Sequence, residues 1–349
     1  MLSSKGLLTT MSSIKTTTDV NDMISPDLLS SLEAIKIGTV IILFILIASI
    51  NLAMGCTMTF NDFKQQWQSP AGIVLSTVSQ FVTYPLVGFI FNYLMNVQSS
   101  YAIGVILVVA SPGSSPSSLF TYLVDGDICM SVCSTALSMI ISLGMLPALM
   151  FIYGSSWTSE TAVIPYTTIA IICAVLISQV LLGMVIRNWA PKIAAYIVTI
   201  GTTVGLVGYS SFALFYILMQ TDIIHSPWSV YFMVLILPIA GFSIGYATGY
   251  IFKQQPHRCR TIALETVFKN IGIAMLVLVG TYAKSDWITC LVFPILYIGM
   301  TVIYGLVYMM VFRAIQKHAA KNEGYASLEA EDDFENPWLL VETDLSFRY

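Results

Sequence analysis

Charged side chains are scarce in this sequence. Asp, Glu, Lys and Arg make up 10% of its 349 residues, whereas hydrophobic residues make up 56% and the mean hydropathy is +0.81. A typical soluble domain has about 25% charged residues. A chain this apolar cannot bury its side chains in one water-soluble core, so we expect the lipid bilayer to be part of its solvent. The net charge of −4 argues against nucleic acid as a partner.

Motifs for catalytic or metal chemistry are also absent. The sequence has three histidines, no HExxH, no CxxC and no cluster of Cys and His. No pair of aspartates occurs within an apolar stretch, so an intramembrane hydrolase is disfavoured and we expect a protein that is not an enzyme. The six cysteines are interpreted as free buried thiols. Because there is no N-x-S/T sequon, no N-glycan is expected.

Nine apolar stretches are each long enough to cross about 30 Å of hydrocarbon, which takes about 20 residues in a helix. The sequence therefore predicts an all-α polytopic membrane protein, with a polar tail at 1–35, a transmembrane domain at 36–313 and a disordered tail at 314–349. A G-protein-coupled receptor, the alternative class, needs seven spans. The predicted spans are Ile37–Met58, Ala71–Leu94, Tyr101–Val124, Ile128–Tyr153, Ala162–Ile186, Ile193–Met219, Trp228–Phe252, Thr261–Tyr282 and Trp287–Phe312.

Basic residues gather in the loops on one side of this predicted domain. Apart from three lysines in the N-terminal tail, the other side holds only Lys284. The positive-inside rule then places the N-terminus outside or in a lumen and the C-terminus in the cytoplasm. We expect the protein in a plasma or endosomal membrane. The basic side holds Lys64, Arg187, Lys192, Lys253, Arg258, Arg260, Arg313, Lys317 and Lys321.

Two spans carry polar residues at mid-depth. The third contains the run 111–118, SPGSSPSS, whose two prolines and glycine free backbone groups that must find partners inside the protein. The alternative is a simple proline kink satisfied by serine hydroxyls. The eighth contains Glu265, Lys269 and Asn270, and ionisable residues at such depth cost several kcal/mol. They predict an ion or substrate site, with a structural i,i+4 ion pair as the alternative.

The two unusual spans are five apart. If spans five to nine form one repeat, and the first repeat is the same unit lacking its opening helix, then spans three and eight are equivalent. A repeat of five helices inverts in the membrane, and inverted repeats with paired broken helices mark secondary transporters. The sequence therefore predicts two broken helices whose breaks meet at a site near the membrane midplane.

Several short motifs resemble the bile acid:sodium symporter family. They occur in the family's order and spacing between Ala34 and Phe312, and they are 51–60 (NLAMGCTMTF), 110–113 (ASPG), 126–127 (GD) followed by Ser131 and 133–135 (CST), 144–147 (GMLP), 164–166 (IPY) and 259–266 (CRTIALET). The resemblance implies a core domain of spans two to four and seven to nine, in which the two broken helices cross, and a panel domain of spans one, five and six. An amphipathic organic anion, such as a bile acid or steroid sulfate, would bind between them and cross by alternating access.

The resemblance also implies two sodium sites. The first carries over to Ser117, Ser118, Ser131, Thr135 and Glu265, with Ser118 where the family usually has Asn. The second carries over to Gln80, Glu265 and the backbone carbonyls of Thr266 and Phe268.

The family has a glutamine where this sequence has Lys269. An ammonium and a sodium ion carry the same charge, so Lys269, with Glu265 and Gln80 as partners, is expected to replace the second sodium. Transport then runs on one sodium, without sodium, or on protons. A family member that no longer transports and serves as a sterol or bile-acid receptor is the alternative.

The polar tail contains two short patterns that resemble signals read by clathrin adaptors. Tyr325 and Leu328 fit a tyrosine-based signal, and Glu335, Leu339 and Leu340 fit an acidic dileucine signal. We expect clathrin adaptors as partners of the tail, beside membrane lipid and the anionic substrate. A chance match is the alternative, because both patterns are short.

Overall fold

The computed structural model describes residues 26–59, 64, 66, 68–157, 166–219, 226–281 and 286–334. Over these residues the chain is helical, with one isolated antiparallel bridge between Gly113 and Lys269 and no strand. This confirms the predicted all-α class. The predicted sorting residues Glu335, Leu339 and Leu340 lie outside the described residues.

Seven stretches of helix in the described chain are long and apolar enough to cross a membrane. One of them, the second predicted span, is built of three consecutive pieces: α5 (Ala71–Val78), the π-helix η1 (Ser79–Thr83) and α6 (Tyr84–Leu94). The other six lie in α3 (Pro26–Thr57), α9 (Ile128–Ile152), α10 (Tyr166–Trp189), α11 (Pro191–Met219), α12 (Trp228–Ile251) and α15 (Asp286–Phe334).

The third and eighth predicted spans are each broken into two short helices. The third consists of α7 (Ser99–Ala110) and α8 (Pro116–Leu123), and the eighth of α13 (Pro256–Val267) and α14 (Ile271–Thr281). Seven continuous and two interrupted spans account for the nine that the sequence predicts. The eighth begins at Pro256 rather than Thr261, because proline suits the first turn of a helix, where its missing N–H is not needed.

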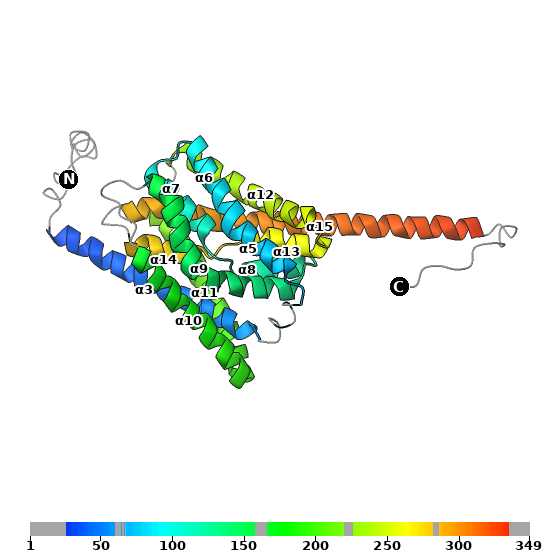
Figure 1. Ribbon diagram of the computed structural model, residues 1–349, viewed down its shortest axis with the longest axis horizontal. Helices are drawn as coiled ribbons and strands as arrows, with labels where there is room; N and C mark the ends of the chain where they lie inside the picture. Colours follow the sequence, from blue (N-terminus) through cyan, green and yellow to red (C-terminus); the bar gives the residue numbers. More distant parts are fainter. Residues whose placement is uncertain are drawn as a thin grey trace.

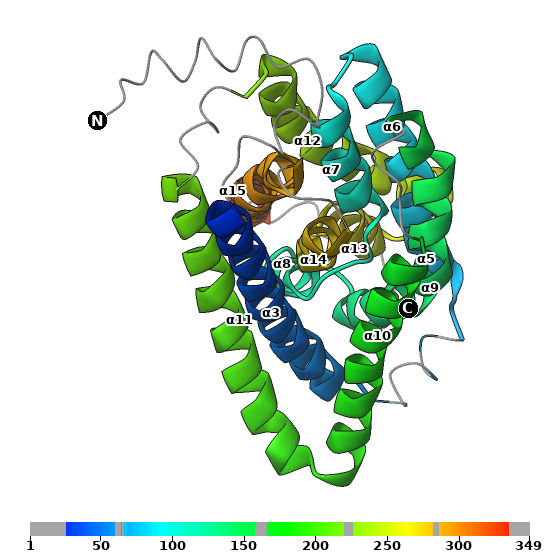
Figure 2. The same cartoon turned by 90° about the vertical axis from the view of Figure 1, so that its left-hand side faces the viewer.

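Three helices form a layer at one side of the molecule. Figure 2 shows α10 and α11 diverging from their short connection, with α3 packed against both. Small residues allow this close packing, since a Cβ on Gly55 of α3 would lie 2.1 Å from the carbonyl oxygen of Val180 in α10. These are the three spans expected to form the panel. The division into core and panel, and the inverted repeat, remain predictions.

The tail at 314–349 was predicted to be disordered, and over 314–334 this is wrong. Helix α15 continues through Phe334 and projects well beyond the bundle (Figure 1). The physical reason is local: residues 314–334 include five alanines and three glutamates and contain no proline, so helical propensity outweighs polarity. Tyr325 and Leu328 lie within this helix.

Candidate functional site

The two breaks lie against each other and complete each other's backbone hydrogen bonds. The N–H of Ser114 donates to the carbonyl of Phe268 at 3.1 Å, and the N–H of Asn270 donates to the carbonyl of Pro112 at 2.7 Å. The bridge between Gly113 and Lys269 lies between these two bonds. Backbone groups freed by each break would otherwise be unpaired in an apolar interior. The predicted crossing of the two broken helices is therefore present.

Glu265 lies beside this crossing, fully buried, and four bonds from three hydroxyls hold its carboxylate. Its Oε1 accepts from Ser117 and Ser131, both at 2.5 Å, and from Thr135 at 3.1 Å, while Oε2 accepts from Thr135 at 3.0 Å. Hydroxyl donors from α8 and α9 thus stabilise a charge that burial alone would disfavour. The Ser118 hydroxyl lies 2.9 Å from that of Ser131. The structure brings together all five residues of the predicted first sodium site.

A small space bounded by oxygens lies beside the carboxylate at Gly113. An added Cβ at Gly113 would lie 3.0 Å from Glu265 Oε2, 3.3 Å from Ser138 Oγ and 3.4 Å from Gln80 Oε1. Ser138 also accepts the Gly113 N–H at 2.9 Å. Sequence reasoning missed Ser138, although it lies one turn beyond Thr135 on the same helix. Gln80 Oε1 is buried and has no hydrogen-bond partner. Oxygen atoms so arranged suit a hard cation.

Lys269 is also buried, and it bonds to a carbonyl that the local helix geometry leaves free. Its Nζ donates to the backbone oxygen of Gln80 at 3.0 Å. In the π-helix the N–H of Tyr84 bonds to the carbonyl of Ser79, five residues back. The next such donor for Gln80 would come from Pro85, which has no N–H. The lysine ammonium supplies the missing donor.

Two aromatic faces complete the surroundings of this ammonium. Nζ lies 5.6 Å from the ring centroids of both Phe81 and Tyr84. Rings at this distance attract a cation, and the attraction is strongest where water is excluded. The cation therefore has a hydrogen bond and two ring faces on one side, all from η1 and the start of α6.

The i,i+4 ion pair between Glu265 and Lys269 is not formed. Helix α13 ends at Val267, so the two residues do not share a helix face. Among the described residues, the ion pairs within bonding distance are Arg258–Asp127 and Arg313–Asp125. The expectation that Glu265 is a direct partner of Lys269 is wrong, and the expected contact with Gln80 is made through its backbone rather than its side chain.

The predicted second sodium site also included the backbone carbonyls of Thr266 and Phe268. The Phe268 carbonyl already accepts a hydrogen bond from Ser114. The predicted ligand at Thr266 is its carbonyl, while its side-chain hydroxyl donates to the carbonyl of Ile262 at 2.7 Å and lies 2.8 Å from Ser79 Oγ. The unpaired Oε1 of Gln80 is the clearest vacant oxygen of the set.

A tyrosine pair closes the end of α13 and was missed by sequence reasoning. Tyr297 donates to the carbonyl of Val267 at 3.0 Å, and its hydroxyl lies 2.5 Å from that of Tyr84. Both rings are fully buried. They satisfy a carbonyl freed by the break, which fixes the position where α13 ends. No sequence motif pointed to them, since each lies in an otherwise ordinary apolar span.

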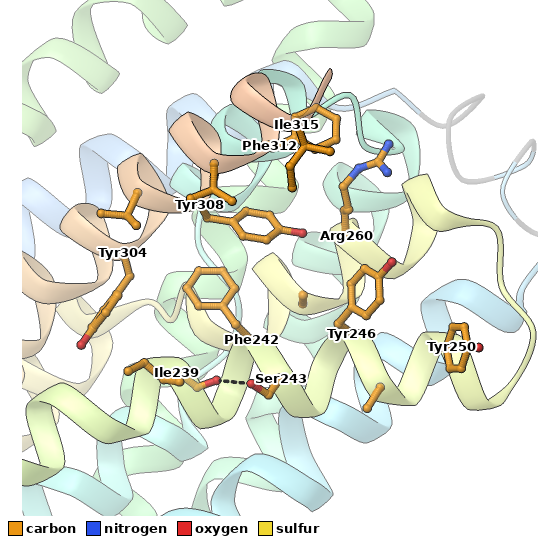
Figure 3. Close-up of a pocket in the computed structure, with 14 residues that line it drawn as sticks. Ile239, Phe242, Ser243, Tyr246, Tyr250, Arg260, Tyr304, Tyr308, Phe312 and Ile315 are labelled. Carbon is orange, nitrogen blue, oxygen red and sulfur yellow. Dashed lines mark hydrogen bonds between the residues drawn. The ribbon is translucent and has the colours of Figure 1, made fainter. Parts of the chain in front are cut away.

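A groove of about 830 Å³ lies apart from this crossing, between α12, α13 and α15 (Figure 3). It is lined mainly by aliphatic and aromatic side chains, with Arg260 as its only charged lining residue. Neither Glu265 nor Lys269 lines it, so it is a separate feature of the molecule.

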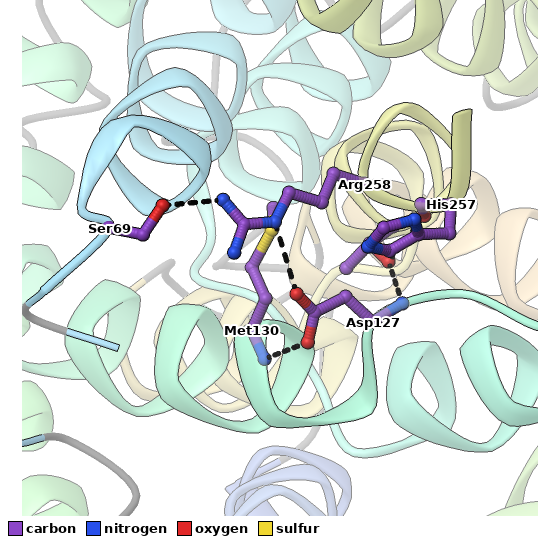
Figure 4. A network of polar contacts seen from close by, with 6 residues as sticks. Ser69, Asp127, Met130, His257 and Arg258 are labelled. Atoms are coloured by element: carbon purple, nitrogen blue, oxygen red, sulfur yellow. Dashed lines mark hydrogen bonds and ion pairs between the residues drawn. The ribbon is translucent and has the colours of Figure 1, made fainter. Parts of the chain in front are cut away.

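A polar network holds the first turns of α9 and α13 beside the entry to α5 (Figure 4). Asp127 caps α9 by accepting the Met130 N–H at 2.9 Å and pairs with Arg258 of α13 at 3.3 Å. Arg258 also donates to the hydroxyl of Ser69 at 2.7 Å. The Asp127 N–H donates to Thr261 at 2.8 Å. Because α13 carries Glu265, this network fixes the helix on which the buried carboxylate depends.

Two broken membrane helices that cross beside a buried carboxylate are typical of secondary transporters. Comparison with known proteins gives the particular family. The model of the Sodium Bile acid symporter family matches residues 42–227, more than half of the chain, and the chain belongs to this family.

Relatives of known name are similar over most of their length. The chain is 29% identical to the ileal sodium/bile acid cotransporter of Mus musculus, over 88% of both chains. It is 30% identical to the Oryctolagus cuniculus protein of the same name, over 81% of this chain and 82% of the relative. It is 24% identical to the sodium-dependent organic anion transporter of Rattus norvegicus, over 81% and 77% respectively.

Proposed function

We propose that the protein is a secondary transporter, not an enzyme, that carries an amphipathic organic anion by alternating access. The observation that carries this proposal is the crossing of the two broken helices beside the fully buried Glu265. The names of its relatives, which include bile acid and organic anion transporters, support the substrate class.

The substrate path is proposed to run between the panel helices α3, α10 and α11 and the core. One polar contact crosses that boundary near the break: Asn270 Nδ2 donates to Asn51 Oδ1 of α3 at 3.3 Å. Asn51 is fully buried, and its own Nδ2 has no partner. An unsatisfied buried amide costs free energy, so a substrate that accepts its hydrogen bond is favoured there.

One sodium ion is proposed to bind at Ser117, Ser118, Ser131, Thr135 and Glu265. The hydroxyls that now donate to the carboxylate would turn their lone pairs to the ion, and all the ligands are the oxygens that a hard cation prefers. Binding and release of this ion would be coupled to the substrate through the crossing, because Ser117 lies on one broken helix and Glu265 on the other.

The ammonium of Lys269 is proposed to take the place of a second sodium. It supplies a positive charge beside Gln80 at the crossing, and Gln80 is one of the residues through which the family resemblance implies the second site. A cation that approached Gln80 Oε1 would meet a like charge a few Å away. Transport is thus expected to be coupled to one sodium ion.

The protein is further proposed to lie in a plasma or endosomal membrane, with its N-terminus outside and its C-terminus in the cytoplasm. The basic residues of the loops support this orientation. The tail is proposed to bind clathrin adaptors through Leu339 and Leu340. Changing both to Ala is expected to change the distribution of the protein between the cell surface and endosomes. An unchanged distribution would contradict the sorting role.

Uptake by cells that express the protein tests the proposed function. Labelled taurocholate and labelled estrone sulfate are supplied in sodium or choline buffer to wild type, to Glu265→Gln and to mock-transfected cells. We expect sodium-stimulated uptake of at least one compound by wild type, and none by Glu265→Gln. Saturable binding of either compound without uptake in any buffer would instead support the alternative, a non-transporting sterol or bile-acid receptor.

A further inference from the structure

The groove between α12, α13 and α15 opens on the outer surface of the helix bundle. Of its lining residues, Ile239 is 44% exposed, Tyr250 73% and Ile315 63%. Exposed apolar side chains on the spans of a membrane protein face lipid rather than water. The groove is therefore a hollow in the lipid-facing surface, apart from the proposed substrate path between panel and core.

One end of the groove is cationic. Arg260 donates through Nη2 to the backbone carbonyl of Asp125 at 2.7 Å, and its guanidinium carbon lies 4.7 Å from the centroid of the Phe312 ring. The carboxylate of Asp125 is engaged elsewhere, with Arg313 at 3.6 Å and Gln316 at 2.7 Å. Among the described residues Arg260 has no carboxylate partner, and its Nε is buried without a hydrogen bond. Its positive charge is available to an anion.

Hydroxyl groups lie on the same side as this guanidinium. Figure 3 shows the rings of Tyr246 and Tyr308 in the groove, with their oxygens directed toward the end where Arg260 lies. The Tyr308 ring stacks on Phe242 with a centroid distance of 5.5 Å, which holds it in the wall. A guanidinium and two phenolic hydroxyls offer several donors to one group of anionic oxygens.

The other end of the groove is apolar and lies deeper along the helices. Ile239 and the ring of Tyr304 lie there (Figure 3), and the Tyr304 hydroxyl donates to the carbonyl of Leu235 at 3.1 Å. At a rise of about 1.5 Å per residue, the stretch of α12 from Ile239 to Tyr250 covers about 16 Å. This is close to half of the hydrocarbon thickness of about 30 Å, which is the depth of one leaflet.

We propose that this groove binds one anionic phospholipid, with its phosphate at Arg260, Tyr246 and Tyr308 and an acyl chain along α12 and α15. The charge at one end and the apolar length of one leaflet fit this molecule. The lipid would pack against Ala263 on α13, the helix that also carries Glu265.

Native mass spectrometry of the purified protein tests the proposal. The protein is taken from nanodiscs of phosphatidylcholine containing phosphatidylserine, and the retained molecules of each lipid are counted. Wild type is expected to retain one phosphatidylserine in preference to phosphatidylcholine. Arg260→Gln is expected to lower that preference at least about tenfold, the loss that follows from removing a hydrogen bond to a charged group. Lys253→Asn is the matched control, since it removes the same charge from the same end but outside the groove.

A second variant tests the groove without changing any charge. Ala247→Trp fills it from the exposed face of α12 and is expected to abolish lipid retention, while Ala195→Trp, on an exposed position of α11, leaves it unchanged. Two results would overturn the proposal: equal retention of both lipids by wild type, or equal effects of Arg260→Gln and Lys253→Asn. Because Ala247→Trp leaves Arg260 in place, instability of the arginine variant does not prevent the test.

Discussion

Replacing Lys269 with Gln is expected to create a second sodium site. The ammonium bonds to the Gln80 carbonyl at 3.0 Å, beside the unpaired Oε1 of the same residue. For two unit charges about 4 Å apart at an effective dielectric constant of about 20, the repulsion is about 4 kcal/mol. Removing it should strengthen sodium binding there by about three orders of magnitude.

The same substitution has a cost when sodium is absent. The Gln80 carbonyl loses its donor, and an unsatisfied buried acceptor costs about 1–3 kcal/mol. The thermal stability of Lys269→Gln should therefore fall below that of wild type in choline buffer and recover in sodium, since a ligand that binds only the folded state stabilises it. The thermal stability of wild type should rise less when sodium replaces choline, because wild type binds one ion.

Binding of radioactive sodium to the purified protein measures the difference directly. We expect one ion per chain for wild type and two for Lys269→Gln. Lys269→Met, which removes the charge without supplying an oxygen ligand, should bind its second ion more weakly. The exposed Lys253→Asn should behave as wild type. Two ions bound to wild type, or equal binding by wild type and Lys269→Gln, would refute the reasoning.

Three further substitutions test the surroundings of the site. Thr135→Val removes a hydroxyl bonded to both carboxylate oxygens and should weaken sodium binding at least about tenfold, whereas Thr203→Val on the exposed face of α11 should not; equal effects would contradict the assignment. Gly113→Ala places a methyl group among three oxygens at 3.0–3.4 Å and should abolish sodium-stimulated uptake, while Gly144→Ala, which meets nothing within 4 Å, should retain it. Gly55→Ala should lower the melting temperature by forcing α3 from α10, at a cost of about 1–3 kcal/mol, and a melting temperature no lower than that of Gly144→Ala would count against this packing.

The sequence predicted much of the fold and the first site because their signals are local. Proline and glycine at 112–116 break one span, and a lone acid marks another. The hydroxyls of Ser117, Ser131 and Thr135 were placed by the family resemblance rather than by spacing, since serine and threonine are common in membrane helices. The structure then brought them to one carboxylate.

The environment of Lys269 was not predictable from spacing alone. Reading Glu265 and Lys269 as an i,i+4 pair assumes a continuous helix, and the chain breaks between them after Val267. Their separation follows from the crossing, a contact between segments far apart in the sequence. Likewise, the carbonyl of Gln80 that accepts from Lys269 lacks a backbone donor because of the π-helix, and the sequence signal for this is Pro85, which has no N–H.

The central claim is that one sodium ion at Glu265 drives transport, with Lys269 standing where a second ion would bind. The most direct measurement is the initial rate of labelled taurocholate or estrone sulfate uptake, whichever is transported, into proteoliposomes of the wild-type protein at varied external sodium. The account predicts a saturable dependence with a Hill coefficient close to one. A coefficient close to two, or the same rate in choline as in sodium, would contradict it.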